Sequence, residues 1–146
     1  QKDFSPACRI KFNRVVFPTD FSPCAGQVFQ QLKEMASCLE EVVLVSVLSQ
    51  IRDSEMWREV QVRNEQEIEK MRAELESLGC RVSVHLAEGT PSRKILEISD
   101  REGASLILMP KRGEGYIKQL LLGSTAEAVA RQSRQPVLLV PCKQEG

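Results

Sequence analysis

Short apolar runs recur along the chain, and longer amphipathic stretches separate them. The run at 42–48 (VVLVSVL) is almost wholly β-branched and aliphatic, which is typical of a strand covered on both faces. The run at 81–87 instead alternates apolar with polar residues, as a half-exposed strand does. We predict strands at Arg14–Phe17, Val42–Leu48, Arg81–Ala87, Leu106–Met109 and Val137–Val140.

Each strand except the last precedes a stretch with a helix-start signal. The first such stretch carries Val28, Leu32, Met35 and Leu39 at helical spacing, so we expect that helix to reach Leu39. The expected helix starts are Ser22-Pro23, Asp53-Ser54, Thr90-Pro91 and the capping-box sequence Ser124-Thr125-Ala126-Glu127, and the expected stops include Gly79 and Gly103.

Strict alternation of strands and helices predicts an α/β fold, with a parallel sheet and helices on both faces. Right-handed crossovers restrict the topology to an open, doubly wound sheet. Ligands of such sheets bind outside the carboxyl ends of the strands, where the strand order reverses. The 146 residues fit one domain, which we assign to residues 13–146, and residues 1–12 form an N-terminal extension.

Charge and composition narrow the classes of function. Lys+Arg and Asp+Glu are both 20, so no basic excess favours nucleic acid as a partner. No apolar run approaches the roughly 18 residues that span a bilayer, so we expect no membrane partner and a cytoplasmic location. The five cysteines have no C-x-x-C spacing and the single histidine, His85, has no companion ligand, so we expect no metal site. Reduced cysteines are the simplest interpretation for a cytosolic protein.

The segment 109–125 has features that suit a phosphate. It leaves a buried strand, passes Gly113 and Gly115, and returns to a helix start through Gly123-Ser124. Glycine lets the backbone approach a ligand closely, and a helix N-terminus offers free N–H groups and about half a positive charge. From the residues alone, Gly123-Ser124 could equally be a turn with a helix cap. Asp20 could cap the first helix, alone or with Ser22, but its place at the carboxyl end of a strand favours a ligand role.

Two common phosphate motifs are absent from the sequence. G-x-x-x-x-G-K-[ST] does not occur, and Gly113-Glu-Gly115 lacks the third glycine of G-x-G-x-x-G. No Ser/His/Asp set, carboxylate pair or P-loop lysine indicates phosphoryl transfer. The residues support neither a P-loop NTPase nor a dehydrogenase, and we do not expect an enzyme; a slow ATPase is the enzymatic alternative.

The order and spacing of several motifs resemble the universal stress protein family. ATP-binding members carry G-x2-G-x9-G-[ST] after the fourth strand, and Pro110, Gly113, Gly123 and Ser124 stand at those positions here. Three further segments resemble the end of the family's first strand, its second strand and its last strand: FPTDFS at 17–22, VVLVSVL at 42–48 and QPVLLV at 135–140. The resemblance covers about residues 13–141. It implies a Rossmann-like, adenine nucleotide hydrolase-like fold with a five-stranded sheet ordered 3-2-1-4-5.

The resemblance also implies an ATP site, with Mg²⁺ held by the phosphates. Asp20 corresponds to the aspartate that faces the adenosine, and Val47 to the residue that contacts adenine through its backbone. Pro110 replaces a glycine and has no N–H, and the neighbouring Lys111 and Arg112 can offset that loss by pairing with phosphate. The expected cofactor-binding residues are Pro18, Thr19, Asp20, Val47, Met109, Pro110, Lys111, Arg112, Gly113, Gly123, Ser124 and Thr125.

The implied role is that of an ATP-binding regulatory stress-response domain, which acts through nucleotide-dependent assembly or partner binding. The last strand is apolar, lies at the expected sheet edge and is bracketed by Pro136 and Pro141. We therefore expect a homodimer through Val137–Val140, as in the family, or the same contact within a tandem chain. A nucleotide-free dimerisation scaffold, motivated by Pro110, is the alternative.

Overall fold

The sheet has the order β3-β2-β1-β4-β5 with every pair parallel, which confirms the predicted fold class and topology. The computed structural model describes residues 12–49, 54–112 and 122–143. The elements along the chain are β1 (Phe12–Pro18), α1 (Pro23–Glu34), the 3₁₀ turn η1 (Ala36–Cys38), β2 (Leu39–Leu48), α2 (Ser54–Ser77), β3 (Arg81–Glu88), α3 (Pro91–Glu102), β4 (Leu106–Pro110), α4 (Ser124–Gln132) and β5 (Val137–Val140).

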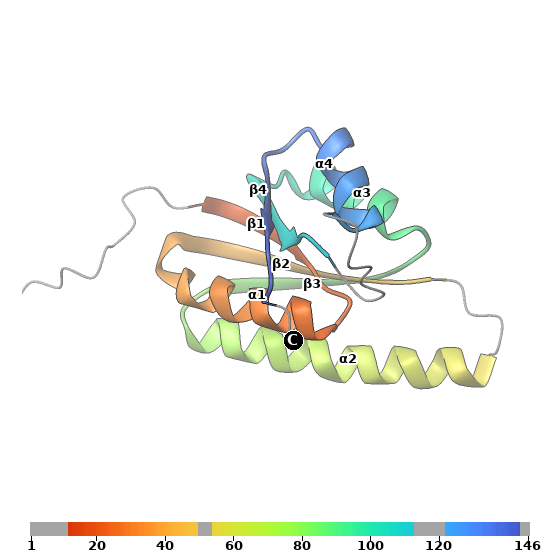
Figure 1. Ribbon diagram of the computed structural model, residues 1–146. Helices are drawn as coiled ribbons and strands as arrows, with labels where there is room; N and C mark the ends of the chain where they lie inside the picture. The colour runs from red at the N-terminus through yellow and green to blue at the C-terminus, as the bar shows by residue number, and fades with distance from the viewer. Residues whose placement is uncertain (1–11, 50–53, 113–121, 144–146) are drawn as a thin grey trace, which may run out of the picture.

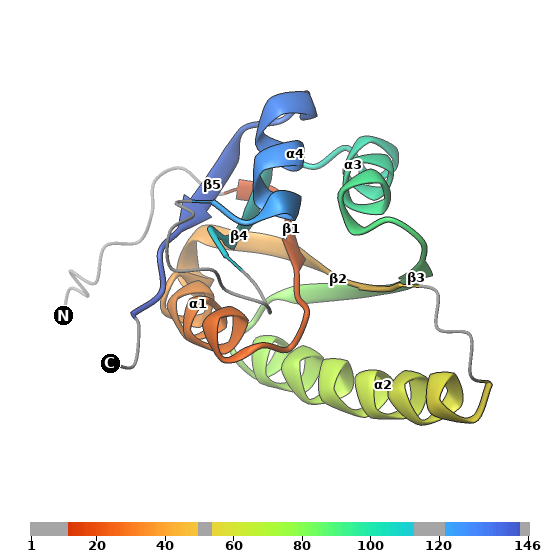
Figure 2. The same ribbon diagram turned by 45° about the vertical axis from the view of Figure 1, so that its right-hand side comes forward.

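Helices cover both faces of the sheet, α1 and α2 on one side and α3 and α4 on the other (Figures 1 and 2). Successive strand residues point to opposite faces, so Val15 and Phe17 pack under α1 while Val16 packs under α3 and α4. This double coverage explains why the central strands are nearly continuous apolar runs.

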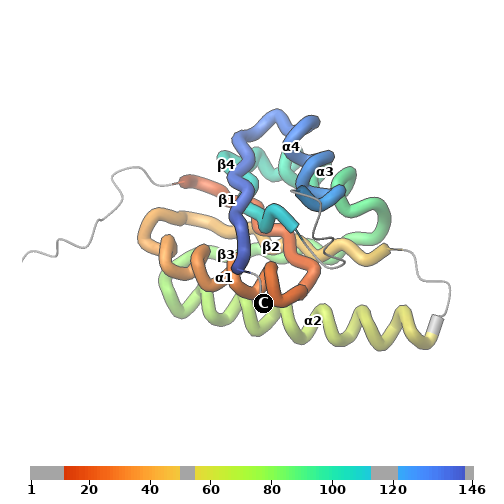
Figure 3. The backbone as a smooth tube through the Cα atoms, in the orientation of Figure 1, coloured from red at the N-terminus to blue at the C-terminus, as the bar shows by residue number. Residues whose placement is uncertain are grey.

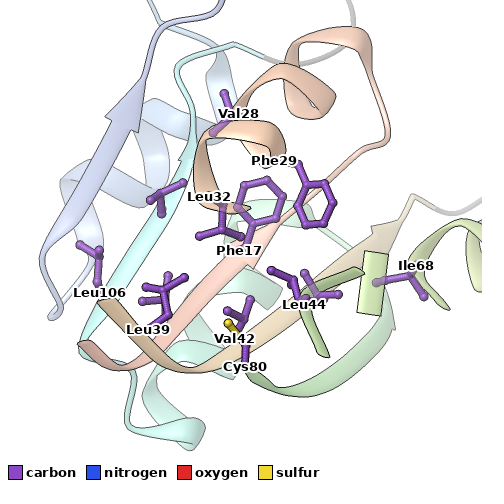
Figure 4. Packing of buried hydrophobic residues seen from close by; sticks show 13 residues of the cluster. Phe17, Val28, Phe29, Leu32, Leu39, Val42, Leu44, Ile68, Cys80 and Leu106 are labelled. Atoms are coloured by element: carbon purple, nitrogen blue, oxygen red, sulfur yellow. The ribbon is translucent and has the colours of Figure 1, made fainter. Parts of the chain in front are cut away.

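The core beneath α1 and α2 includes an aromatic pair, seen in Figure 4. The rings of Phe17 and Phe29 have centroids 5.8 Å apart at 48°, an arrangement worth about 0.5–1.5 kcal/mol beyond the burial of area. The buried members of this cluster are Val15, Phe17, Val28, Phe29, Leu32, Leu39, Val42, Leu44, Ile68, Leu75, Cys80, Leu106 and Leu108.

The first helix is shorter than its periodicity predicts. It ends at Glu34, and Cys38 N–H donates to the Met35 carbonyl in the 3₁₀ turn that follows. Leu39, expected on the helix, is instead the first residue of β2 and pairs with Phe12. The prediction was wrong because Leu39 packs into the same cluster as α1, and apolar spacing does not show that the chain has turned. Phe12, expected in the extension, begins β1, and residues 1–11 lie outside the described part.

The longest described helix, α2, lies beside α1 and packs along β2 and β3 (Figures 1 and 3). Its later half buries Ile68 and Leu75 against the sheet, and Gly79 ends the region with a positive φ of 93°. In the described residues no helix is long and apolar enough to cross a membrane.

A disulfide joins Cys24 in the first turn of α1 to Cys142 just after β5, so the expectation of reduced cysteines is wrong. The two residues are 118 apart in sequence, and the sheet order brings them together by returning the end of β5 to α1. Gln27 of α1 also binds the segment after β5: its side chain donates to the Lys143 carbonyl (3.1 Å) and accepts from the Lys143 N–H (2.8 Å). Cys38 is also disulfide-bonded.

Cys80 is a free thiol in the core under α2. Burial raises the pKa of this thiol above its ordinary value, which keeps it protonated and unreactive.

Candidate functional site

A cleft of about 920 Å³ opens beyond the carboxyl ends of β1, β2 and β4. The strand order reverses between β1 and β4, which is where ligands of such sheets bind. Every expected site residue that the structure describes lines this cleft, namely Pro18, Thr19, Asp20, Val47, Met109, Pro110, Lys111, Arg112, Gly123, Ser124 and Thr125. The twelfth, Gly113, lies outside the described residues. The structure thus brings these residues together, and their part in binding stays a prediction.

A tight turn after β1 forms one wall of the cleft. Phe21 has a φ of 59°, a conformation that a bulky side chain rarely adopts and that costs roughly 1–3 kcal/mol. Its N–H donates to Thr19 Oγ1 (3.0 Å), and the Ser22 N–H donates to Asp20 Oδ1 (3.0 Å). Ser22 Oγ accepts from the Ala25 N–H and so caps α1. Asp20 therefore holds the turn at the edge of the cleft, and the cap of α1 is Ser22.

The end of β2 exposes backbone groups to the cleft. The Thr19 N–H donates to the Val45 carbonyl (2.8 Å) just where β1 ends. Strand residues two apart direct their backbone groups to the same side. Val47 consequently turns its N–H and carbonyl toward the space that β1 has left, and it offers a ligand one donor and one acceptor.

The opposite end of the cleft is the start of α4. The Lys111 N–H donates to the Val140 carbonyl (3.0 Å), and the Gly123 N–H donates to the Lys111 carbonyl (2.7 Å), so the chain returns to the point where it left β4. Gly123 is the N-cap and Ser124 the first helical residue. The expected capping box is therefore not formed: among the described residues no side chain caps α4, which leaves its first-turn N–H groups available to a ligand.

Helix α2 supplies a wall that the sequence analysis did not assign to the site. Val60, Asn64, Glu67 and Met71 line the cleft, together with Arg63. Their spacing of four, three and four residues, on a helix whose later half packs on the core, is the signal that could have shown that this face turns inward.

Charge is distributed unevenly along the cleft. Lys111 and Arg112 stand with the start of α4 at one end, whereas at the other end Arg63 and Glu67 on α2 carry opposite charges. A ligand with an anionic tail is thereby favoured in one orientation, with the tail toward α4.

Other titratable groups gather away from the cleft. His85 Nε2 lies 2.8 Å from Glu102 Oε2, in a pair between β3 and the end of α3, and neither residue lines the cleft. In residues 12–49, 54–112 and 122–143, no three His, Cys, Asp or Glu side chains gather as a metal site.

A family model described as the universal stress protein family matches residues 11–141. A universal stress protein of Methanocaldococcus jannaschii is 26% identical over 158 residues, covering 92% of this chain and 98% of its own. The solved structure of that protein superposes with a TM-score of 0.87 at 28% identity, covering 93% of this chain and 100% of the other.

Two solved members contain nucleotides and share the fold. A universal stress protein in complex with cAMP has a TM-score of 0.67 at 21% identity, covering 91% of this chain and 99% of its own. A family protein of Arabidopsis thaliana with AMP bound has a TM-score of 0.69 at 13% identity, covering 90% and 92%.

Proposed function

The chain belongs to the universal stress protein family, and we propose that it is a regulatory domain that binds ATP in the cleft above β1 and β4. The observation that carries this proposal is the uncapped start of α4 beside Lys111 and Arg112, at the switch point of the sheet. Free N–H groups, a helix dipole and two cations together suit a chain of phosphates. Nucleotide state would then control assembly or partner binding.

The proposed orientation places the phosphates at α4 and the adenine at Val47. Adenine carries an amino donor beside a ring acceptor, and Val47 offers an acceptor and a donor in return. The relatives that contain cAMP and AMP support an adenine nucleotide. We favour ATP because Lys111 and Arg112 would form their strongest charge-assisted hydrogen bonds with the outer phosphates. Mg²⁺ would enter with those phosphates, since it keeps several waters and takes few protein ligands.

ATP is expected to raise the melting temperature of the protein by roughly 5–10 °C at 100 times its Kd, because this saturation adds about 2.7 kcal/mol to stability. Differential scanning fluorimetry with ATP–Mg²⁺ and AMP measures the shift, and AMP should give a smaller one at equal concentration. Chromatography of the heat-denatured protein tests for co-purified nucleotide. No shift and no released nucleotide would favour the dimerisation scaffold instead.

We also propose a homodimer through β5. The strand lies at the sheet edge, and Leu138 is 44% exposed while Val137 and Leu139 pack against the core. Exposed apolar residues on an unpaired edge favour a second copy of the same strand.

Leu138→Lys is expected to convert the dimer to a monomer of 16.4 kDa without unfolding it, because the side chain contributes little to the core. Light scattering at micromolar concentration measures the mass. Leu86→Lys is the matched control, since Leu86 is 43% exposed on β3 at the opposite edge. A monomeric wild type, or equal effects of the two substitutions, would contradict the β5 dimer.

A further inference from the structure

The inward face of α2 changes character along its length. In its later half it packs on the sheet through the apolar Ile68 and Leu75. The α2 residues that line the cleft are Val60, Arg63, Asn64, Glu67 and Met71, and the polar Asn64 and Glu67 stand within about one turn of Ile68. Polar residues on an inward-facing stripe are unfavourable against an apolar core, so at these positions α2 faces the open cleft.

The side chain of Asn64 is half-buried and lines the cleft. Its carboxamide makes no hydrogen bond to another described residue, and because the side chain is only half-buried, this polar group is open to the cleft. Glu67 has one oxygen 3.5 Å from Lys70 Nζ, and this exposed pair is weak. The wall therefore presents an amide with donors and acceptors beside a carboxylate that only accepts.

The base of a bound nucleotide would lie against this wall. With the phosphates at α4, the far end of the ligand reaches Val47 and α2. If the edge of adenine formed by N1 and the N6 amine meets the backbone of Val47, the adjoining edge, formed by N7 and the second N6 hydrogen, remains for α2.

We propose, on the basis of the proposed function, that Asn64 and Glu67 read the N6/N7 edge of the adenine base. The Asn64 amide donates to N7 and its oxygen accepts from the N6 amine, a pairing whose geometry suits adenine. Glu67 is a second acceptor for that same N6 hydrogen, because the other N6 hydrogen is donated to the Val47 carbonyl. Guanine carries an oxygen in place of this amine, so the carboxylate would face an acceptor and disfavour that base.

The test compares ATP with 7-deaza-ATP, which lacks only the N7 acceptor. Wild-type protein should bind 7-deaza-ATP about 10-fold more weakly, in keeping with the loss of one half of a bidentate contact. Asn64→Leu should bind ATP about 10-fold more weakly and should no longer distinguish the two nucleotides. Isothermal titration calorimetry of wild type and Asn64→Leu, each with ATP and with 7-deaza-ATP, gives the coupling between Asn64 and N7 directly.

Gln66→Leu is the matched control, because Gln66 is exposed on α2 and does not line the cleft. This variant should keep the wild-type ratio of ATP to 7-deaza-ATP affinity. Glu67→Gln, compared with Glu65→Gln, should improve GTP binding relative to ATP by about 10-fold.

Binding of inorganic tripolyphosphate separates a contact with the base from damage to the fold. It should be equal in wild type and Asn64→Leu. A wild type that binds ATP and 7-deaza-ATP equally, or an Asn64→Leu variant that still distinguishes them, would overturn the inference and leave the ATP site standing. Failure of the wild type to bind ATP would overturn both.

Discussion

Replacing Gly123 by valine is expected to weaken ATP binding by more than about 100-fold, or roughly 2.7 kcal/mol. Gly123 lines the cleft as the N-cap of α4, so an isopropyl group there occupies space beside the first-turn N–H groups. Hydrogen bonds to a charged group contribute about 1.5–3 kcal/mol each, and displacing the phosphates would lose at least two of them. Titration calorimetry with ATP–Mg²⁺ measures the loss.

The fold should survive this substitution. Gly123 has φ −70° and ψ 156°, a backbone conformation that valine adopts without strain. Thr90→Val is the matched control, because Thr90 is the N-cap of α3, has a similar backbone, makes no side-chain cap bond and does not line the cleft. The control should bind ATP normally. Unchanged affinity in Gly123→Val would place the phosphates elsewhere.

The fold was predictable because local sequence and tertiary structure agree along most of the chain. The run from Val42 to Leu48 has one structural solution, a strand buried on both faces, and Ser22-Pro23 starts α1 as expected. The local pattern predicted the wrong element where consecutive elements pack into the same apolar cluster. Leu39 fits the periodicity of α1 and the interior of β2 equally well, and only the turn at Met35 decides between them.

The candidate site was predictable where it follows strand ends. Pro18, Val47 and Pro110 come directly from strands whose order is known, so the fold itself brings them together. The wall from α2 was not predicted, because helical spacing marks one face of α2 and only its packing on the sheet shows how far that face turns toward the cleft. The sequence did not predict the positive φ of Phe21 either, because no local sequence signal favours this conformation in a bulky residue.

The disulfide could not be derived from spacing either. Cys24 and Cys142 meet only after the whole sheet has been assembled, and the sequence offers no pattern that pairs them. Disulfides persist mainly in oxidising compartments, with proteins of hyperthermophiles as an exception inside cells. The cytoplasmic location therefore stays a prediction, and the redox state of the purified protein bears on it.

Removing this disulfide is expected to cost about 2–4 kcal/mol of unfolding free energy. The bond joins residues 118 apart, and a closed loop of this size restricts the unfolded chain strongly, with an upper value of about 5 kcal/mol in the chain-entropy description. For a domain of this size the loss lowers the melting temperature by roughly 5–15 °C. Urea unfolding of Cys24→Ser/Cys142→Ser under non-reducing conditions measures it.

A second comparison separates this bond from the one at Cys38. Reductant added to the double variant breaks only the disulfide of Cys38. Any further loss of unfolding free energy is then the contribution of that bond. Because the effect acts mainly through the unfolded chain, ATP affinity should change little between wild type and the double variant. Peptide mapping of the wild type should recover Cys24 linked to Cys142. Equal stability of wild type and double variant, with that linkage present, would show that the bond contributes no net stabilisation.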